Sequence, residues 1–363
     1  MRNKLPLFWV KVFYYEYWPF WLFFLPLVPY WLYLALRARS LTYFTAANPG
    51  IEHSGVFGES KIDILNKIDP QYLPITLYFK GSMNWQEVVQ KLESTDLDYP
   101  IIIKPNVGER GSQVEKVNDL IELQRYMESN KEDFIIQEYL QLPMELGVLF
   151  YRVPGTEERG ITSIVIKEFL TVTGDGKSTI KGLILKNERY RLQLGSLQSK
   201  LRVQMDEVLN EGEERLLQPI GNHCLGTKFL SGQHFINDKT IEVFDRIAST
   251  IEGFNFGRFD LKVTSVVDLM AGKNIKIMEL NGVTSEAGHI YDPKYNLFRA
   301  YRDAAKTMKV MFRVSQQSRK LGAAVTPAGE MWRLIRTHFS NKSIAKEKVT
   351  KNLSLPNALG GIQ

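Results

Sequence analysis

Apolar and polar residues alternate with a period of two in the segments 257–263 and 275–282. This alternation is typical of a strand that buries one of its faces. The segment between them includes 271–274, Ala-Gly-Lys-Asn, which has the composition of a turn. The pattern therefore predicts two antiparallel strands joined as a hairpin.

Four polar side chains lie on this predicted hairpin. Counting by two places Arg258 with Asp260 on one face of the first strand, and Glu279 with Asn281 on one face of the second. Carboxylate and amide oxygens of this kind suit Mg²⁺, which keeps several waters and is completed by the phosphates of a substrate. A solvated strand face that carries an ion pair explains the same residues, and the hairpin alone does not decide between the two.

A second group of polar residues follows a buried strand earlier in the chain. Apolar residues before Lys104 predict this strand, and a glycine-bearing loop follows it. Backbone N–H groups of such a loop can surround a phosphate while the ammonium neutralises its charge. The loop residues of interest are Gly108, Gly111 and Ser112.

Two carboxylates come next along the chain. The short apolar strand 134–140 carries Glu138, and Glu145 lies seven residues further on. Apolar residues at helical spacing fill most of the remaining chain. The predicted helices are 85–97, 116–131, most of 181–217, and 238–253, and the segment 41–47 is predicted as a strand.

Residues 1–40 differ from the rest in being almost continuously apolar. The run Tyr17–Leu36 has twenty residues without a charge, about the number needed to cross a bilayer. Three prolines interrupt it and basic residues lie on both sides, whereas a spanning helix prefers its basic flank on the cytoplasmic side. We therefore predict an interfacial or re-entrant membrane anchor with both ends in the cytoplasm. A single span and a buried aromatic helix pair are the alternatives.

The composition narrows the classes of function. With 363 residues and 44% apolar residues, the chain can bury one large core or several subdomains. The net charge of +6 suits anionic lipid or anionic substrates but is not by itself a nucleic-acid footprint, so we expect no nucleic-acid partner. The single cysteine, Cys224, excludes an intramolecular disulfide and is consistent with a reducing compartment.

The order of these residues resembles the ATP-grasp superfamily of carboxylate–amine ligases. The resemblance spans Lys61 to Met311 and rests on a lysine, a glycine loop, two glutamates, and the Arg-x-Asp and Glu-x-Asn strands, in that order. The segments 172–180 and 219–227 are similar to the ATP-grasp module of cyanophycin synthetase, more than to D-alanine–D-alanine ligase. The resemblance implies an α/β (α+β) fold in which two α+β subdomains hold ATP between them.

The resemblance also implies roles for individual residues. Lys61 and Lys104 match lysines that contact the ATP phosphates. Glu138 matches the acid that meets the adenine amino group, and Glu145 matches a carboxylate that takes the ribose hydroxyls. The loop that closes over the phosphates corresponds to Gly108, Gly111 and Ser112.

The metal site and the catalytic arginine follow from the same resemblance. Asp260, Glu279 and Asn281 match the Mg²⁺ ligands, with Glu279 as the bridge between two ions, and Mn²⁺ can take the place of Mg²⁺. Arg258 matches the arginine that stabilises the transferring phosphoryl group, a role that Lys104 shares.

Four regions are predicted along the chain. Most ATP-grasp enzymes carry a full α/β domain before the nucleotide strands, and here only a remnant is left. Its loop 48–59 either holds a substrate group, through Glu52, His53 and Glu59, or simply connects. The regions are a hydrophobic aromatic membrane anchor (1–40), a reduced pre-ATP-grasp region (41–98), the ATP-grasp domain (99–315) and a basic amphipathic C-terminal tail (316–363), which is either membrane-bound or solvated.

The expected function is that of a ligase. The enzyme would be ATP-dependent and ADP-forming, and would join a carboxylate donor to an amine acceptor through an acyl phosphate, on a membrane or cell-envelope substrate. The expected cofactors are ATP and Mg²⁺, membrane lipid is an expected partner, and the expected location is the cytoplasmic side of a membrane. The alternatives are a phosphotransferase or a ligase with a non-amine acceptor, and a membrane protein that binds nucleotide without turnover.

Overall fold

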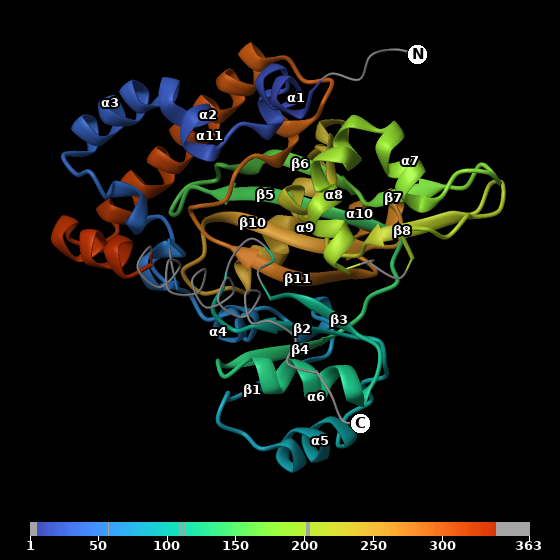
Figure 1. The fold of residues 1–363 in the computed structure, drawn as a ribbon. Coiled ribbons are helices and arrows are strands. Elements are labelled where there is room, and N and C mark those ends of the chain that lie inside the picture. Colours follow the sequence, from blue (N-terminus) through green and yellow to red (C-terminus); the bar gives the residue numbers. More distant parts are fainter. Residues whose placement is uncertain (1–5, 57, 109–110, 112, 201–203, 339–363) are drawn as a thin grey trace.

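The computed structural model describes residues 6–56, 58–108, 111, 113–200 and 204–338. Within these residues, three antiparallel sheets and their helices form two bodies that meet along one side (Figure 1). The smaller body lies at the bottom of Figure 1, and the larger body lies above it with the N-terminal helices at its top. The mixture of helices with antiparallel sheets agrees with the predicted fold class.

The smaller body is a four-stranded sheet with two helices on one face. Its elements are β1 (Thr76–Phe79), α5 (Trp85–Glu93), β2 (Ile101–Pro105), β3 (Glu115–Val117), α6 (Leu120–Ser129) and β4 (Phe134–Glu138). The strand order is β1-β4-β2-β3. Phe79, Ile101 and Phe134 belong to the apolar cluster between sheet and helices. Asn84 and Asp119 cap the two helices by accepting backbone N–H groups of the first turn.

The larger body is built on a five-stranded sheet in the order β11-β10-β5-β6-β9, whose strands are β5 (Met144–Arg152), β6 (Arg159–Glu168), β9 (Lys228–Ser231), β10 (Phe256–Val263) and β11 (Ile275–Asn281). Helices α9 (Asp238–Ser249) and α10 (Val266–Ala271) belong to one face, where Phe244 packs against Phe259. On the other face, α11 (Leu297–Lys320) covers Leu149 and Phe256. Arg258, Asp260 and Lys167 also lie on that second face.

A side lobe extends from the larger body, at the right of Figure 1. It contains β7 (Leu170–Thr173), α7 (Ile180–Lys186), α8 (Glu188–Lys200) and β8 (Glu214–Gln218), with β7 paired to β8. The short helix α4 (Lys61–Leu65) lies between the two bodies and contacts β11. Ser60 caps it by accepting the backbone N–H of Asp63.

The N-terminal segment forms α1 (Leu7–Phe13), α2 (Phe20–Phe24) and α3 (Val28–Ala38), separated by short 3₁₀ turns. Prolines explain the interruptions, because Pro19 precedes α2 and Pro26 lies in the turn before α3. Among the described residues, the stretch Phe20–Ala38 is long and apolar enough to cross a membrane, and 22% of its most apolar window is buried. Length and composition alone do not distinguish a span from a surface segment.

Three local predictions are wrong. The segment between the two hairpin strands is not a simple turn but the helix α10, which Ser265 caps and Gly272 ends in a left-handed conformation. The segment 41–47 is not a strand: Tyr43–Ala46 is a 3₁₀-helix, followed by Asn48, whose side chain bonds the backbone of β10. The end of the predicted helical region 181–217 is instead the strand β8.

Candidate active site

Strands β10 and β11 carry the predicted metal ligands. In the register of this antiparallel pair, Arg258 lies opposite Asn281 and Asp260 lies opposite Glu279. Opposed residues of an antiparallel pair project from the same face of the sheet. All four side chains therefore project from one face, as the alternation predicted. A bulge precedes Glu279 on β11 and leaves Met278 without an opposite residue.

Asp260 is the centre of the charges on this face. It is 4% exposed and accepts from Arg258 Nη2 at 2.9 Å, Asn281 Nδ2 at 2.9 Å and Lys167 Nζ at 3.0 Å. Burial acts to raise the pKa of Asp260, but Arg258 and Lys167 outweigh it and lower that pKa to about 2. The carboxylate is therefore ionised throughout the physiological range.

Lys167, on β6, is a site residue that the sequence reasoning missed. Its Nζ lies 3.0 Å from Glu145 Oε1 and 3.0 Å from Asp260 Oδ1, and its side chain is 8% exposed. Burial acts to lower the pKa of Lys167, but the two carboxylates prevail and raise it above its usual value. A signal was present in the sequence, because one lysine at the end of an apolar strand is the same pattern that identified Lys104.

Gly147, on β5, leaves room for these charges. It lies opposite Asp260 on one side and Val165 on the other. A Cβ atom at this position would lie 2.8 Å from Val165 Cγ1 and 3.2 Å from both Arg258 Cδ and Asp260 Oδ1. A glycine in the middle of a strand is thus explained by the close approach of functional side chains.

Lys104 reaches from the smaller body to the larger one. Its Nζ donates to Gln137 Oε1 and to the carbonyl oxygen of Met278, each at 3.1 Å. Burial lowers the pKa of Lys104 to about 8, against the opposing influence of Glu279 and Asp260. The structure therefore brings this lysine to β11, which carries two of the predicted metal ligands, in spite of their distance in the sequence.

Two residues of the glycine loop are described, and they have different neighbours. Gly108 lies beside Lys61, and Gly111 lies beside Asn222. Lys61, the first residue of α4, donates from Nζ to the carbonyl oxygen of Gly108 at 2.6 Å. Gly111 has a left-handed φ of +70°, and a Cβ atom there would lie 3.3 Å from Asn222 Nδ2. Gly111 thus lies against the 220–225 segment. Ser112, predicted as part of this loop, lies outside the described residues.

The two predicted nucleotide carboxylates differ in their surroundings. Glu138, at the end of β4, is half-buried and accepts the backbone N–H of Ile75 at 3.2 Å. Glu145 is 6% exposed and is engaged by Lys167 at 3.0 Å, with Lys262 Nζ 3.9 Å away. A ribose hydroxyl that contacted Glu145 would compete with these two lysines. The adenine contact of Glu138 and the ribose contact of Glu145 stay predictions.

The donor set on β10 and β11 fits a magnesium ion in its chemistry. No group of three or more His, Cys, Asp or Glu side chains suited to a metal occurs among the described residues. Asp260 and Glu279 nevertheless supply two carboxylates from one face, with Asn281 beside them. Mg²⁺ is commonly held by one or two carboxylates, with waters and substrate phosphates as the other ligands.

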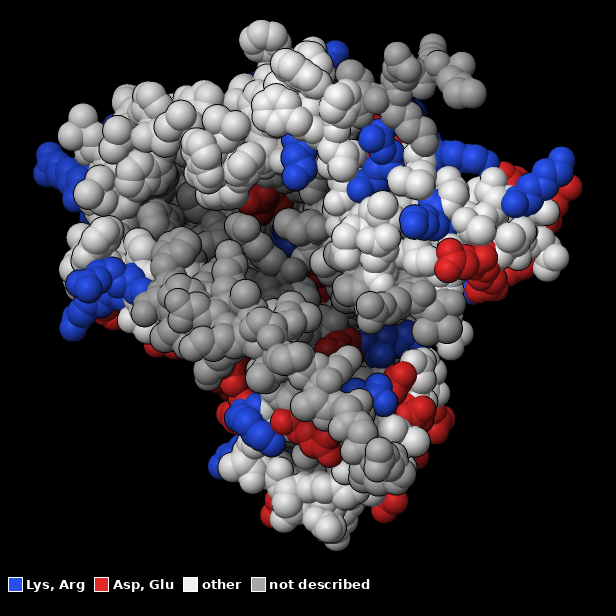
Figure 2. Space-filling view, in the orientation of Figure 1, with Lys and Arg blue, Asp and Glu red and all other residues white. Residues whose placement is uncertain are grey.

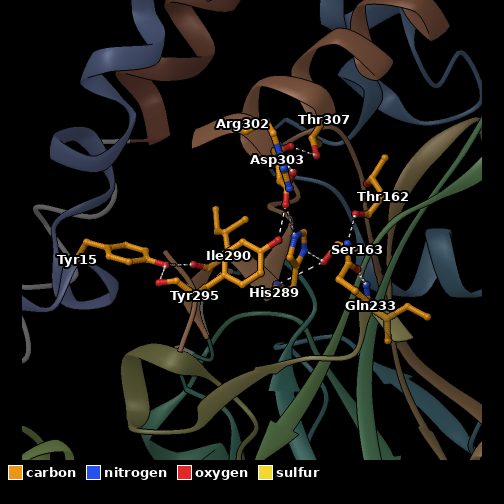
Figure 3. Close-up of polar contacts among 11 residues, drawn as sticks. Tyr15, Thr162, Ser163, Gln233, His289, Ile290, Tyr295, Arg302, Asp303 and Thr307 are labelled. Carbon is orange, nitrogen blue, oxygen red and sulfur yellow. Dashed lines mark hydrogen bonds and ion pairs between the residues drawn. The ribbon is translucent and has the colours of Figure 1, made fainter. Parts of the chain in front are cut away.

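A second polar cluster lies under α11 and joins three elements of the larger body (Figure 3). His289 Nδ1 lies 2.8 Å from Ser163 Oγ, and Nε2 lies 3.4 Å from Asp303 Oδ2. These are the residue types of a hydrolase triad, but His289 is 0% exposed and Ser163 is 1% exposed. Burial lowers the pKa of His289. No substrate can reach this serine, so we interpret the cluster as a structural joint.

Comparison with known proteins supports the resemblance found in the sequence. A family model described as the tubulin-tyrosine ligase family matches residues 76–147, which carry Lys104, the glycine loop and both carboxylates that are predicted to contact the nucleotide. The matched segment is about a fifth of the 363-residue chain. Within it, Lys104 donates to the carbonyl oxygen of Met278 on β11, the strand that carries Glu279. No curated protein sequence matches the chain.

Three solved structures illustrate the partial similarity of the chain to known ligases. The VanG D-Ala:D-Ser ligase of Enterococcus faecalis is 16% identical, with 69% of this chain and 56% of that chain covered and a TM-score of 0.36. The D-alanine–D-alanine ligase of Bacillus anthracis complexed with ATP is 14% identical, with coverages of 71% and 66% and a TM-score of 0.37. A bifunctional glutathione synthetase of Pasteurella multocida is 13% identical, with coverages of 66% and 34% and a TM-score of 0.34.

The chain thus spans between 34% and 66% of the lengths of these three chains. Likenesses with TM-scores of 0.34 to 0.37 are partial, and no residue role follows from them.

Proposed function

We propose that the chain is an ADP-forming carboxylate–amine ligase that makes an amide bond through an acyl phosphate. The observation that supports this best is the meeting of Lys104, from the smaller body, with the charged face of the larger one. That face presents the Asp260 carboxylate between two cations. Ammonium and guanidinium groups next to ionised carboxylates suit a polyphosphate with its divalent ions.

The chemistry begins from the low reactivity of a carboxylate, whose leaving group would be oxide. A donor carboxylate oxygen attacks the γ-phosphorus of ATP, the bond to the β-phosphate oxygen breaks, and ADP leaves with an acyl phosphate formed. The neutral amine of the acceptor attacks the acyl carbon, loses a proton, and inorganic phosphate departs. We propose that Arg258 and Lys104 neutralise charge on the transferring phosphoryl group, and that positioning supplies most of the remaining acceleration.

The metal would be held by Asp260, Glu279 and Asn281. Bound Mg²⁺ would neutralise the oxygens of the β- and γ-phosphates. Lys167 holds Asp260 in place from β6, two strands away in the sheet, so the orientation of this carboxylate does not depend on the metal. Two ions, bridged by Glu279, are the stoichiometry that we propose.

The nucleotide would be covered from the smaller body. We propose that Lys61 and the loop at Gly108 and Gly111 close over the phosphates, because water would hydrolyse an acyl phosphate. Glu138 and Glu145 remain the proposed contacts of adenine and ribose. Lys61 already touches this loop through the carbonyl oxygen of Gly108, which supports its place at the phosphates.

We also propose a location at the cytoplasmic side of a membrane, where ATP is present, with a lipid-linked or cell-envelope substrate. The support is the apolar N-terminal segment on the same body as the site. A phosphotransferase, or a ligase with a non-amine acceptor, is the main alternative, because the same kind of site can transfer the γ-phosphoryl group of ATP to other acceptors. A binding protein without turnover would form no ADP.

Hydroxylamine trapping tests the proposal. Detergent-solubilised protein is incubated with Mg-ATP, hydroxylamine, pooled amino acids and lipid extract, and the Glu279→Gln variant is the blank. A hydroxamate that forms only with the intact site supports acyl-phosphate chemistry, and its mass names the carboxylate donor. ADP without hydroxamate supports phosphotransfer, and no ADP under any condition contradicts the ligase proposal.

A further inference from the structure

The outward side chains of the N-terminal segment form a continuous apolar surface. The most exposed large apolar residue of each helix is Phe8 in α1 (68%), Trp21 in α2 (67%) and Leu36 in α3 (78%). Residues 6–41 contain a single acid, Glu16, which is buried and paired with Arg189. An exposed apolar surface of this extent, without exposed acidic residues, indicates a site that contacts a membrane or another protein.

The opposite face of the segment is fixed to the larger body. Phe23 is 1% exposed and its ring stacks on Tyr301, with 5.1 Å between the ring centroids. The Tyr15 hydroxyl donates to the carbonyl oxygens of Ile290 and Tyr295, at 2.7 and 3.0 Å (Figure 3). A straight span through a bilayer would pull these buried groups away from α11. The contacts therefore favour helices that lie flat on the protein.

Basic side chains lie around this apolar surface. The exposed side chains of Lys11, Arg37 and Arg39 are its cations. In Figure 2 the region over the N-terminal helices is almost entirely white, with blue atoms mainly towards its edges, whereas red and blue patches mix over the smaller body. Apolar and aromatic side chains with cations near the rim are typical of helices that bind the interface of an anionic membrane.

We propose that the outer face of α1, α2 and α3 docks into the interface of an anionic lipid bilayer, with the helices in the membrane plane and none of them crossing it. Anionic lipid is thereby named as the partner of the N-terminal segment. The docking itself does not depend on the proposed function, which enters only through the expected lipid-linked substrate. Anionic lipid is favoured over a protein partner because the exposed charged side chains described on this surface are all cations, and because Trp and Tyr side chains suit the headgroup level.

Docking in this way places the membrane beside the segment that follows β11, the strand of Glu279 and Asn281. The Tyr15 contacts fall on Ile290 and Tyr295, in the loop 288–295 that lies between β11 and α11. The ring of Phe23 lies 5.8 Å from that of Tyr291 in the same loop. A substrate whose reactive group stands at the headgroups would meet the site from this side.

The test uses the full chain and vesicle flotation. Purified protein is mixed with phosphatidylcholine vesicles, with and without phosphatidylglycerol, and compared with the triple variant Phe8→Glu, Trp21→Glu, Leu36→Glu. The matched control is Val267→Glu, at an equally exposed position (76%) on α10. We expect the wild type and the control to float, more strongly with phosphatidylglycerol, and the triple variant to lose at least about tenfold in partitioning. Alkaline carbonate should release the wild type from the vesicles.

Several outcomes would overturn the proposal. Equal flotation of the triple variant would place membrane binding elsewhere, and resistance to carbonate would indicate a spanning helix. Dimers that dissociate in the triple variant, without vesicle binding by the wild type, would assign the surface to a second copy of the chain. Binding of Mg-ATP is measured on every variant, so a failed docking surface is distinguishable from a failed nucleotide site.

Discussion

The two bodies contribute their cations to the site in different ways. In the larger body, Arg258 and Lys167 are paired with the ionised carboxylate of Asp260, at 2.9 and 3.0 Å. On the other side of the site, Lys104 of the smaller body and Lys61 of α4 donate to the backbone carbonyl oxygens of a strand bulge and a loop. Arg258 and Lys167 are therefore held by an anionic partner, whereas Lys61 and Lys104 are held by neutral acceptors.

This difference indicates which half of the site rearranges. An ammonium that donates to a neutral carbonyl oxygen makes a hydrogen bond worth about 1.5–3 kcal/mol. An anionic phosphate oxygen adds the attraction between opposite charges, so Lys61 and Lys104 gain when they exchange a carbonyl oxygen for it. We expect the larger body to be preorganised and these two lysines to change partners when nucleotide binds.

The largest effect is expected from Asp260→Asn. The substitution leaves the buried cations Arg258 and Lys167 without their shared counter-charge, and breaking a buried pair in this way costs about 3–5 kcal/mol. The free energy of unfolding in urea should fall by that amount, and ADP formation should stop. Glu279→Gln is the matched control on the same face, with lost activity but a stability change within about 1 kcal/mol. Equal stability losses in both variants would contradict a preorganised Asp260.

The next largest effect is expected from Gly147→Ala. The new methyl group would lie 2.8 Å from Val165 Cγ1 and 3.2 Å from the Arg258 and Asp260 side chains. Overpacking of this kind costs about 1–3 kcal/mol in the free energy of unfolding. Gly195→Ala, in a helix with nothing within 4 Å of the added atom, should be neutral or stabilising by up to about 1 kcal/mol. Thermal unfolding of the two variants would show whether the site needs a glycine.

The pH dependence of Mg-ATP binding should report on Lys104. Its pKa is lowered by burial to about 8, so the ammonium that attracts phosphate is lost as the pH rises above that value. The folded pKa lies below the usual 10.5, so the unfolded state binds more protons between these values and the free energy of unfolding rises with pH there.

Titration calorimetry between about pH 7 and pH 9.5 should show Mg-ATP affinity weakening above about pH 8, by up to about tenfold per unit. Lys104→Arg keeps its charge over this range and should remove that inflection. An unchanged profile in the arginine variant would assign the titration to another group.

The smallest effect on stability is expected from Lys61→Ala. The side chain is partly exposed and donates to the neutral carbonyl oxygen of Gly108, so the free energy of unfolding should change by less than about 1 kcal/mol. Mg-ATP affinity should fall at least about tenfold, because a charged contact to phosphate is lost. Lys67→Ala removes a similar contact, to the carbonyl oxygen of Gly50, and should leave the affinity unchanged. Equal losses in both would contradict a phosphate role for Lys61.

Local patterns in the sequence were enough to predict the charged face of β10 and β11. Alternation by two residues placed Arg258 with Asp260 and Glu279 with Asn281, and the register confirms that all four share one face. This prediction succeeds because the period of a strand is fixed by its backbone geometry. The strand that carries Lys104 was predicted instead from its run of apolar residues.

Contacts between distant segments could not be predicted in this way. Lys167 joins the site only because β6 lies beside β5 in the sheet, which brings it to Glu145 and Asp260. The segment 41–47 has strand-like composition, but Asn48 ties its end to Phe256 by hydrogen bonds at 2.7 and 2.8 Å. Tertiary contacts of this kind override local preference.

The most direct test of the central claim is the transfer of oxygen from donor to phosphate. Once hydroxamate trapping has named the donor, its carboxylate is labelled with ¹⁸O, and the inorganic phosphate released during amide formation is examined by mass spectrometry. An acyl-phosphate ligase moves one ¹⁸O atom into phosphate for each amide formed. Amide formation with unlabelled phosphate would contradict the proposed mechanism.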